Sequence, residues 1–114
     1  MDSAASHAII HTLHLLVLGP LLIAIGLGYL AGWSRLVAGL GIFIVLYHAW
    51  KTYSKWAAGK NPWVNLIHVL VVGPALIVEG SMSNPPRYVK EIILMLGIAA
   101  VGYHGYYLVV DLMK

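Results

Sequence analysis

Residues 4–30 form one long stretch without a single Asp, Glu, Lys or Arg residue. A stretch of this kind is typical of a helix that crosses a bilayer, which needs roughly 17–25 apolar residues. Three further apolar segments follow, at about residues 36–50 (continuing to 56), 63–78 and 92–110, the last with a helical start near Pro86. None shows the alternating polarity of a strand, and helices satisfy their own backbone hydrogen bonds in lipid. The sequence therefore predicts an all-α fold with four helices.

Composition indicates a membrane rather than an aqueous setting. Hydrophobic residues make up 61% of the chain and charged residues 10%, whereas a soluble domain has about 45–50% and about 25%. The connectors between the apolar segments are short, so no separate soluble domain is expected. We expect residues 1–114 to form a single transmembrane domain of an integral, multi-pass membrane protein whose main partner is the lipid bilayer.

Aromatic and basic residues near the segment ends are consistent with this topology. Aromatic side chains gather at the boundary between lipid and water, and five lie near segment ends: Tyr29, Trp33, Trp56, Trp63 and Tyr88. Four lysines fall on the side of the termini and the middle connector: Lys51, Lys55, Lys60 and Lys114. Only Arg35, Arg87 and Lys90 fall on the other side. By the positive-inside rule this small excess places the termini in the cytoplasm.

An internal repeat organises the chain. "LHLLVLGPLLIAIG", which begins at Leu13, recurs as "IHVLVVGPALIVEG" at an offset of 54, and "LGIFIVLYH", which begins at Leu40, recurs as "LGIAAVGYH" at an offset of 56. We interpret the chain as a duplicated helical hairpin, with repeats at about residues 4–58 and 62–114. Such parallel repeats are related by an axis along the membrane normal. The expected architecture is a pseudo-twofold four-helix bundle in which sequential helices are antiparallel neighbours.

The repeat carries one histidine in each helix: His14, His48, His68 and His104. Counted from the connectors, and at about 1.5 Å of rise per residue, the four rings fall at a similar depth. Ionisable residues inside a membrane face the bundle interior or a water-filled cavity and indicate function by default. The sequence thus predicts a layer of four histidines.

Ligand binding is the first interpretation of this layer. Imidazole is a common ligand of haem iron and of transition metals such as Zn and Cu. Gly41 and Gly97 each precede a histidine by seven residues, which is two helical turns on the same face. They could leave a slot for a flat macrocycle. A four-helix membrane bundle with inward histidines resembles the membrane b-type cytochromes in architecture, which implies haem b, held axially by His14 with His68 or by His48 with His104.

Two other interpretations stay open. In the first, the histidines bind no cofactor and form a helix-packing network in a scaffold or accessory subunit of a larger membrane assembly or virus particle, or in a homo-oligomer. In the second, they belong to a proton or ion path, because His7, His11 and His14 stack on one helical face and Glu79 and Asp111 follow His68 and His104. His7 and His11 carry less weight than the layer, since the repeat counterpart of His11 is Asn65.

Other features are given structural readings. Pro20 and Pro74 lack an N–H and should bend their helices, which frees the carbonyls of Leu16 and Leu70. Known zinc-protease, nucleophile-elbow and phosphate-loop patterns do not occur, which makes an enzyme a less favoured reading. No basic stripe supports nucleic-acid binding. Cysteine is absent, so disulfides are excluded.

Overall fold

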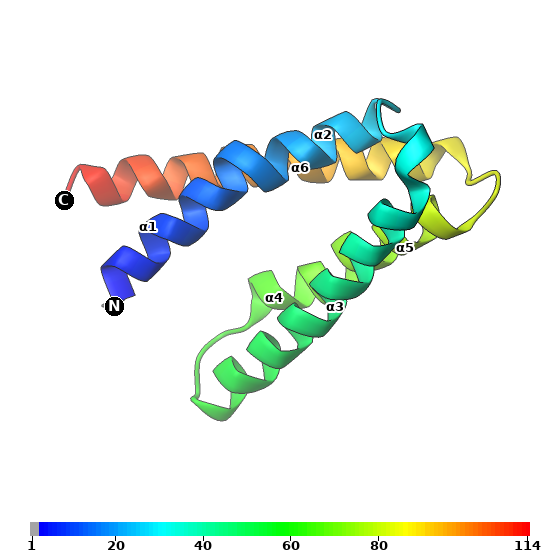
Figure 1. Cartoon of the computed structure of the whole chain (residues 1–114). Coiled ribbons are helices and arrows are strands. Elements are labelled where there is room, and N and C mark those ends of the chain that lie inside the picture. Colours follow the sequence, from blue (N-terminus) through cyan, green and yellow to red (C-terminus); the bar gives the residue numbers. More distant parts are fainter. Residues whose placement is uncertain (1–2) are drawn as a thin grey trace. The chain divides into compact units, whose positions relative to one another are not determined.

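A computed structural model describes residues 3–114, with side chains from Ser6 onward except that of His7. Figure 1 shows helices joined by short connectors. The elements in chain order are α1 (Ser3–Leu13), the π-helix η1 (His14–Leu18), α2 (Gly19–Gly26), the 3-10 helix η2 (Ala31–Trp33), α3 (Ser34–Ala57), α4 (Trp63–Ile67), the π-helix η3 (His68–Val72), α5 (Gly73–Ser81) and α6 (Arg87–Leu112). Residues 3–114 contain no β-strand. Because α1, η1 and α2 run on as one helix, and α4, η3 and α5 as another, the predicted all-α fold with four helices is confirmed.

The helix ends differ from the sequence boundaries for local reasons. The first helix ends at Gly26, before residue 30, and Gly28 in the following turn has a φ of +88°, a conformation that glycine adopts without strain. Helix α3 continues to Ala57 and so has 24 residues, which removes the apparent shortage of length in the second segment. The last helix begins at Arg87, directly after Pro86, as the sequence predicted.

The chain divides into two compact units. Unit 1 comprises Met1–Tyr29 and Lys90–Lys114, and unit 2 comprises Leu30–Val89. Unit 1 therefore combines the first helix with α6, and unit 2 combines α3 with the helix formed by α4, η3 and α5. Each unit thus takes one helix from each predicted repeat, so the packing units cut across the repeat boundaries.

Helix α3 in unit 2 packs antiparallel against α5 (Figure 1). Gly41 lies against the backbone of Gly73, whereas Ala38, earlier in α3, lies against Gly80, later in α5. Opposite orders of contact along the two chains are the mark of antiparallel helices. Second and third helices are therefore neighbours, as predicted for sequential helices.

Unit 1 shows the same arrangement between α2 and α6. Gly19 lies against Gly97, and Gly26, later in α2, lies against Leu94, earlier in α6. The first and the fourth helix of the chain are thus antiparallel neighbours, a pairing that the sequence analysis did not predict. Small residues at these contacts let the backbones approach closely, as in many membrane helix pairs.

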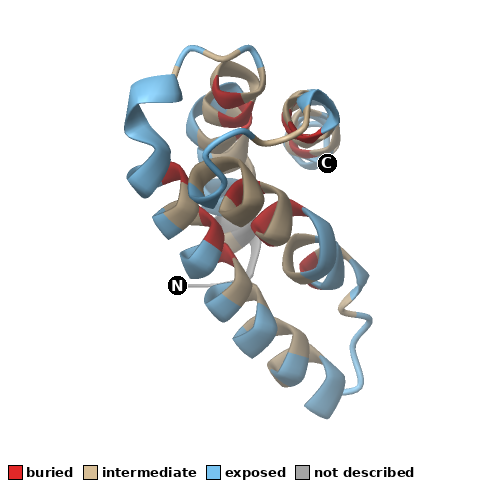
Figure 2. Cartoon of the chain, turned by 90° about the vertical axis from the view of Figure 1, so that its right-hand side faces the viewer, coloured by how far each residue is buried: buried red, intermediate tan, exposed pale blue. Residues whose placement is uncertain are grey.

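Buried side chains follow stripes along the helices (Figure 2). In α3 the buried residues are Val37, Gly41 and Ile44, which recur every three or four positions, the spacing of one helical face. Leu76 in α5 and Ile93 in α6 are fully buried. Most other large apolar side chains are exposed. Each helix therefore has one covered stripe and a broad apolar outer face.

Candidate functional site

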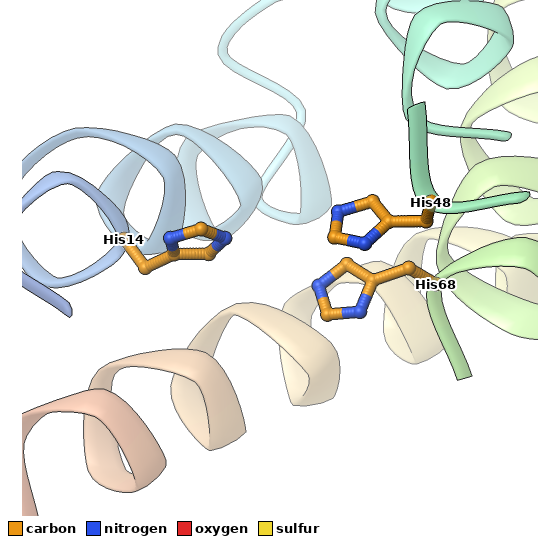
Figure 3. Close-up of side chains that lie close together, drawn as sticks. All are labelled: His14, His48 and His68. Atoms are coloured by element: carbon orange, nitrogen blue, oxygen red, sulfur yellow. The ribbon is translucent and has the colours of Figure 1, made fainter. Parts of the chain in front are cut away.

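Two of the four predicted site histidines meet inside unit 2. His48 lies in α3 and His68 begins η3, and their ring centroids are 4.0 Å apart with an angle of 18° between the ring planes. Figure 3 shows these two rings lying one over the other, carried by neighbouring helices, while its third label, His14, belongs to unit 1. A ring nitrogen of His48 lies within 4.8 Å of a ring nitrogen of His68. The two histidines therefore stand at the same level of their helix pair.

Hydrogen bonds fix both rings of this pair. The His68 Nδ1–H donates to the backbone carbonyl of Val64 at 2.7 Å, and the His48 Nδ1–H donates to Oδ1 of Asn65 at 2.7 Å. Both acceptors are carbonyl oxygens, which cannot donate, so Nδ1 carries the hydrogen in each ring and the lone pair of the neutral imidazole lies on Nε2. Such a bond on one ring nitrogen is the usual support for a histidine that ligates a metal through the other.

The other two predicted histidines meet inside unit 1. The ring centroids of His14 and His104 are 4.3 Å apart, with 30° between the ring planes. The His14 Nδ1–H donates to the carbonyl of Ile10 at 2.8 Å, which repeats the bond from His68 to Val64. His104 is only 6% exposed, and its Nδ1 lies 2.7 Å from Nδ1 of His11. Unit 1 therefore holds three histidines in contact.

The hydrogen bonds described at Nδ1 of the histidines thus correspond in the two units, with a different partner residue at one position. In unit 2, His48 is bonded to Asn65. In unit 1, His104 is bonded to His11, the repeat counterpart of Asn65. The sequence analysis set His11 aside because its counterpart is a different residue. The signal that could have identified the pair is a polar residue three positions before each first-helix histidine, within an apolar segment.

A π-helix precedes each Gly-Pro pair and begins at the site histidine. η1 spans His14–Leu18 and η3 spans His68–Val72, and each closes with a bond from the N–H of the following glycine to the histidine carbonyl. Proline removes one N–H and its ring crowds the carbonyl four residues earlier. A wider turn ahead of the proline accommodates both effects, and single π turns are frequent at functional sites. The sequence predicted a bend here but not this backbone form.

The glycines proposed as a macrocycle slot lie against backbone. A Cβ added to Gly41 would lie 2.7 Å from the carbonyl oxygen of Gly73, and one added to Gly97 would lie 3.0 Å from that of Gly19. Within each unit the neighbouring helix therefore fills the space that the missing side chain leaves. This geometry favours close helix packing as the role of both glycines.

Residues of the predicted ion path are described in part. The carboxylate of Asp111 lies near the C-terminal end of α6, where its Oδ1 is 3.5 Å from Nζ of Lys114 and both side chains are exposed. Glu79 is half-buried in α5 of unit 2. The side chain of His7, the first member of the stacked histidines, lies outside the described residues. The local setting of Asp111 is that of a helix terminus rather than of a buried polar thread.

Known proteins provide no assignment for the residues of this site. No known protein family, no curated protein and no solved structure shows a significant match to the chain.

Proposed function

We propose that the chain spans a membrane four times and binds a transition-metal ion through its paired histidines. Each of the four continuous helices contains a span that is long and apolar enough to cross a bilayer: Ala8–Gly26, Ala31–Ala57, Trp63–Ser81 and Arg87–Leu112, of 19, 27, 19 and 26 residues. Within the most apolar stretch of each span, only 17–22% of the residues are buried in the protein. Large contiguous apolar surface is rare on a soluble monomer. Lipid would cover this outer face.

Aromatic residues support the same placement. The five predicted boundary residues lie at or next to helix ends, and each side chain is largely exposed: Tyr29, Trp33, Trp56, Trp63 and Tyr88. Amphipathic aromatic rings of this kind are favoured at the level of the lipid headgroups. The termini and the middle connector would face the cytoplasm, as the excess of lysine on that side predicts.

Recurring local structure supports the duplicated hairpin as the origin of the two sites. The π-helix, the Gly-Pro pair and the bond from the histidine to the carbonyl four residues earlier occur in both copies. Duplication of one hairpin would create two helix pairs. Each pair would contain one histidine from the first helix of a hairpin and one from the second helix of a hairpin. One ion per helix pair is the stoichiometry that follows.

The observation that carries the metal proposal is the pair of hydrogen bonds at Nδ1 of His48 and His68 in unit 2. Both Nδ1–H groups of His48 and His68 donate to carbonyl oxygens, which leaves Nε2 as the ligating nitrogen of each ring. A bound metal–nitrogen distance is roughly 2.0–2.1 Å, so two ligating nitrogens stand at most about 4 Å apart. One ring nitrogen of His48 already lies within 4.8 Å of one ring nitrogen of His68, which is close to that separation. Imidazole ligands suit Zn, Cu and Ni.

Haem fits the individual units less well than a metal ion. A haem held by two histidines would need room for its flat macrocycle between the two imidazole rings. The pairs in the two units have centroids only 4.0 Å and 4.3 Å apart and are stacked or tilted. The axial pairs suggested by the sequence take one histidine from each unit, so haem b stays a prediction and a transition metal is the proposal.

Metal loading of the purified protein tests this function. The protein in detergent is stripped with a chelator, incubated with Zn²⁺ or Cu²⁺, separated from free metal by gel filtration and assayed for metal content. We expect up to two ions per chain, with the double variant H48A/H68A losing the ion of unit 2 and H14A/H104A losing that of unit 1. A wild-type protein that retains no metal would overturn the proposal.

A scaffold is the second candidate, and the hydrogen bonds between helices favour it. Within each helix pair, a side chain of one helix is hydrogen-bonded to a side chain of the other: His104 to His11 in unit 1, and His48 to Asn65 in unit 2. Such bonds contribute about 0.6 kcal/mol on average in a membrane protein. A metal that binds only the folded state at about 100 times its Kd adds about 2.7 kcal/mol. Unfolding with and without Zn²⁺ separates the two: a scaffold shows no metal-dependent stabilisation.

A further inference from the structure

His48 in unit 2 and His104 in unit 1 hold equivalent positions in the repeat but have different hydrogen-bond partners. In unit 2 the partner is Asn65, which is 5% exposed and presents Oδ1 at 2.7 Å from Nδ1 of His48. In unit 1 the partner is His11, whose Nδ1 lies 2.7 Å from Nδ1 of His104. The two partners hold equivalent positions in the repeat, three residues before His68 and His14. Among the Nδ1 hydrogen bonds described for the two units, this is the position at which the partner residue differs.

The two partners differ in chemistry. An amide oxygen only accepts, so Oδ1 of Asn65, as it faces His48, places the hydrogen on Nδ1 of His48. An imidazole nitrogen is a donor in one tautomer and an acceptor in the other, so the bond between His11 and His104 exists in two tautomeric arrangements. Only the arrangement in which His104 donates leaves the lone pair on Nε2 of His104. Metal binding at that nitrogen would select it.

We propose that His11 is the positioning residue for His104 as a metal ligand and makes the site of unit 1 bind metal more tightly than the site of unit 2. An imidazole nitrogen is a stronger base than an amide oxygen, so its hydrogen bond places more electron density on the ring of His104. Outer-shell partners raise the basicity of a ligating histidine in this way, and their removal typically lowers metal affinity by about 10–100-fold. This inference rests on the proposed metal-binding function.

Aromatic rings contact both members of this hydrogen bond. The ring of Tyr107 stacks on His11, with centroids 5.9 Å apart and 15° between the planes. Tyr103 meets His104 edge to face at 5.0 Å. Both tyrosines come from α6, the helix that carries His104. The helix pair therefore fixes the orientation of the donor and the acceptor of the bond.

Zinc competition with a chromophoric chelator tests the inference with the two sites separated. The background H48A/H68A retains only the pair of unit 1, and H14A/H104A retains only that of unit 2. We expect the first background to bind Zn²⁺ more tightly. In it, H11L should weaken binding by about 10–100-fold. H11N, which supplies the acceptor found in unit 2, should recover most of that loss. The reciprocal change N65H should tighten binding in the second background.

Nitrogen-15 NMR of the metal-free protein provides a readout that a merely structural role would not move. Wild-type His104 should show nitrogen shifts averaged between two tautomers, and H11N should shift them to the Nδ1–H pattern of His48. Equal Zn²⁺ affinities in the two backgrounds, together with no effect of H11L, would overturn the role of His11 and leave metal binding intact. Absence of Zn²⁺ binding in wild type and in both backgrounds would instead overturn the proposed function itself.

Discussion

Replacing Gly41 with alanine should separate α3 from α5, and Gly39 in the same helix provides a matched control. A Cβ at position 41 would lie 2.7 Å from the carbonyl oxygen of Gly73 and 2.9 Å from the backbone nitrogen of Ile77, whereas ordinary contacts begin at 3.4 Å. A Cβ at position 39 would meet nothing within 4 Å. Backbone atoms cannot rotate away as a side chain can, so the two helices must move apart in G41A.

The magnitude follows from two opposing effects. Alanine is favoured over glycine inside a helix by about 0.8–1.0 kcal/mol, and this gain is common to G39A and G41A. An extra methyl group in a tightly packed contact costs about 1–3 kcal/mol. Because the propensity gain is the same in both variants, it cancels when their free energies of unfolding are compared. We therefore expect G41A to have a free energy of unfolding about 1–3 kcal/mol lower than that of G39A.

Reversible unfolding in mixed detergent micelles measures this difference. Circular dichroism records the loss of helix as the fraction of SDS is raised, and the midpoints of wild type, G39A and G41A are compared. Equal midpoints for the two variants would refute the close approach of α3 and α5. The same comparison applies to unit 1, where Gly97 lies against α2 and Gly102 in the same helix has nothing within 4 Å of an added Cβ.

Two further predictions concern the buried amide and the topology. Asn65→Ala removes the acceptor of the part-buried His48 Nδ1–H, and a typical hydrogen bond contributes about 0.5–1.5 kcal/mol, so the SDS midpoint should fall. An unchanged midpoint would contradict a stabilising hydrogen bond between these two side chains. In this cysteine-free chain, Lys60→Cys and Ser83→Cys lie in connectors at opposite ends of unit 2. A membrane-impermeant maleimide should label them from opposite sides of sealed vesicles, and labelling of both from one side would exclude the proposed spanning of α4, η3 and α5.

The number and type of helices were predictable because they depend on local composition. Charge-free apolar stretches without alternating polarity satisfy their backbone hydrogen bonds within the segment as helices, so four segments predicted four helices. The start of α6 after Pro86 was predictable for a similar reason, since proline fits the beginning of a helix better than its interior. Helix ends at Gly26 and Ala57 depended on turn geometry, which composition resolves poorly.

Pairing of the helices was not predictable in the same way. Connector length favours sequential neighbours, and it identified α3 with α5 correctly. The partner of α2 depends instead on which small residues face each other, and Gly19 against Gly97 are separated by most of the chain. No local pattern specifies such a contact, although the repeat contains both glycines.

His11 and Asn65 were missed because similarity between the copies was taken as the measure of importance. The two residues share no side-chain type, but each presents a hydrogen-bonding atom to Nδ1 of the histidine on the opposite helix. Their common property is position and hydrogen-bond capacity, which becomes visible only when the helix pairs are known. The levels of the histidines within each pair, by contrast, followed from simple counting along the helices.

The division of the packing units across the two repeats bears on how such a chain could have arisen. If the repeat marks two copies of one hairpin, the helix that packs on α3 in unit 2 and the helix that packs on α2 in unit 1 each come from the other copy. An ancestral hairpin would have found those partners only in a second molecule, with each subunit exchanging helices with the other. Fusion of two such subunits would make the association independent of concentration and would let the two copies differ where this chain has His11 in one and Asn65 in the other.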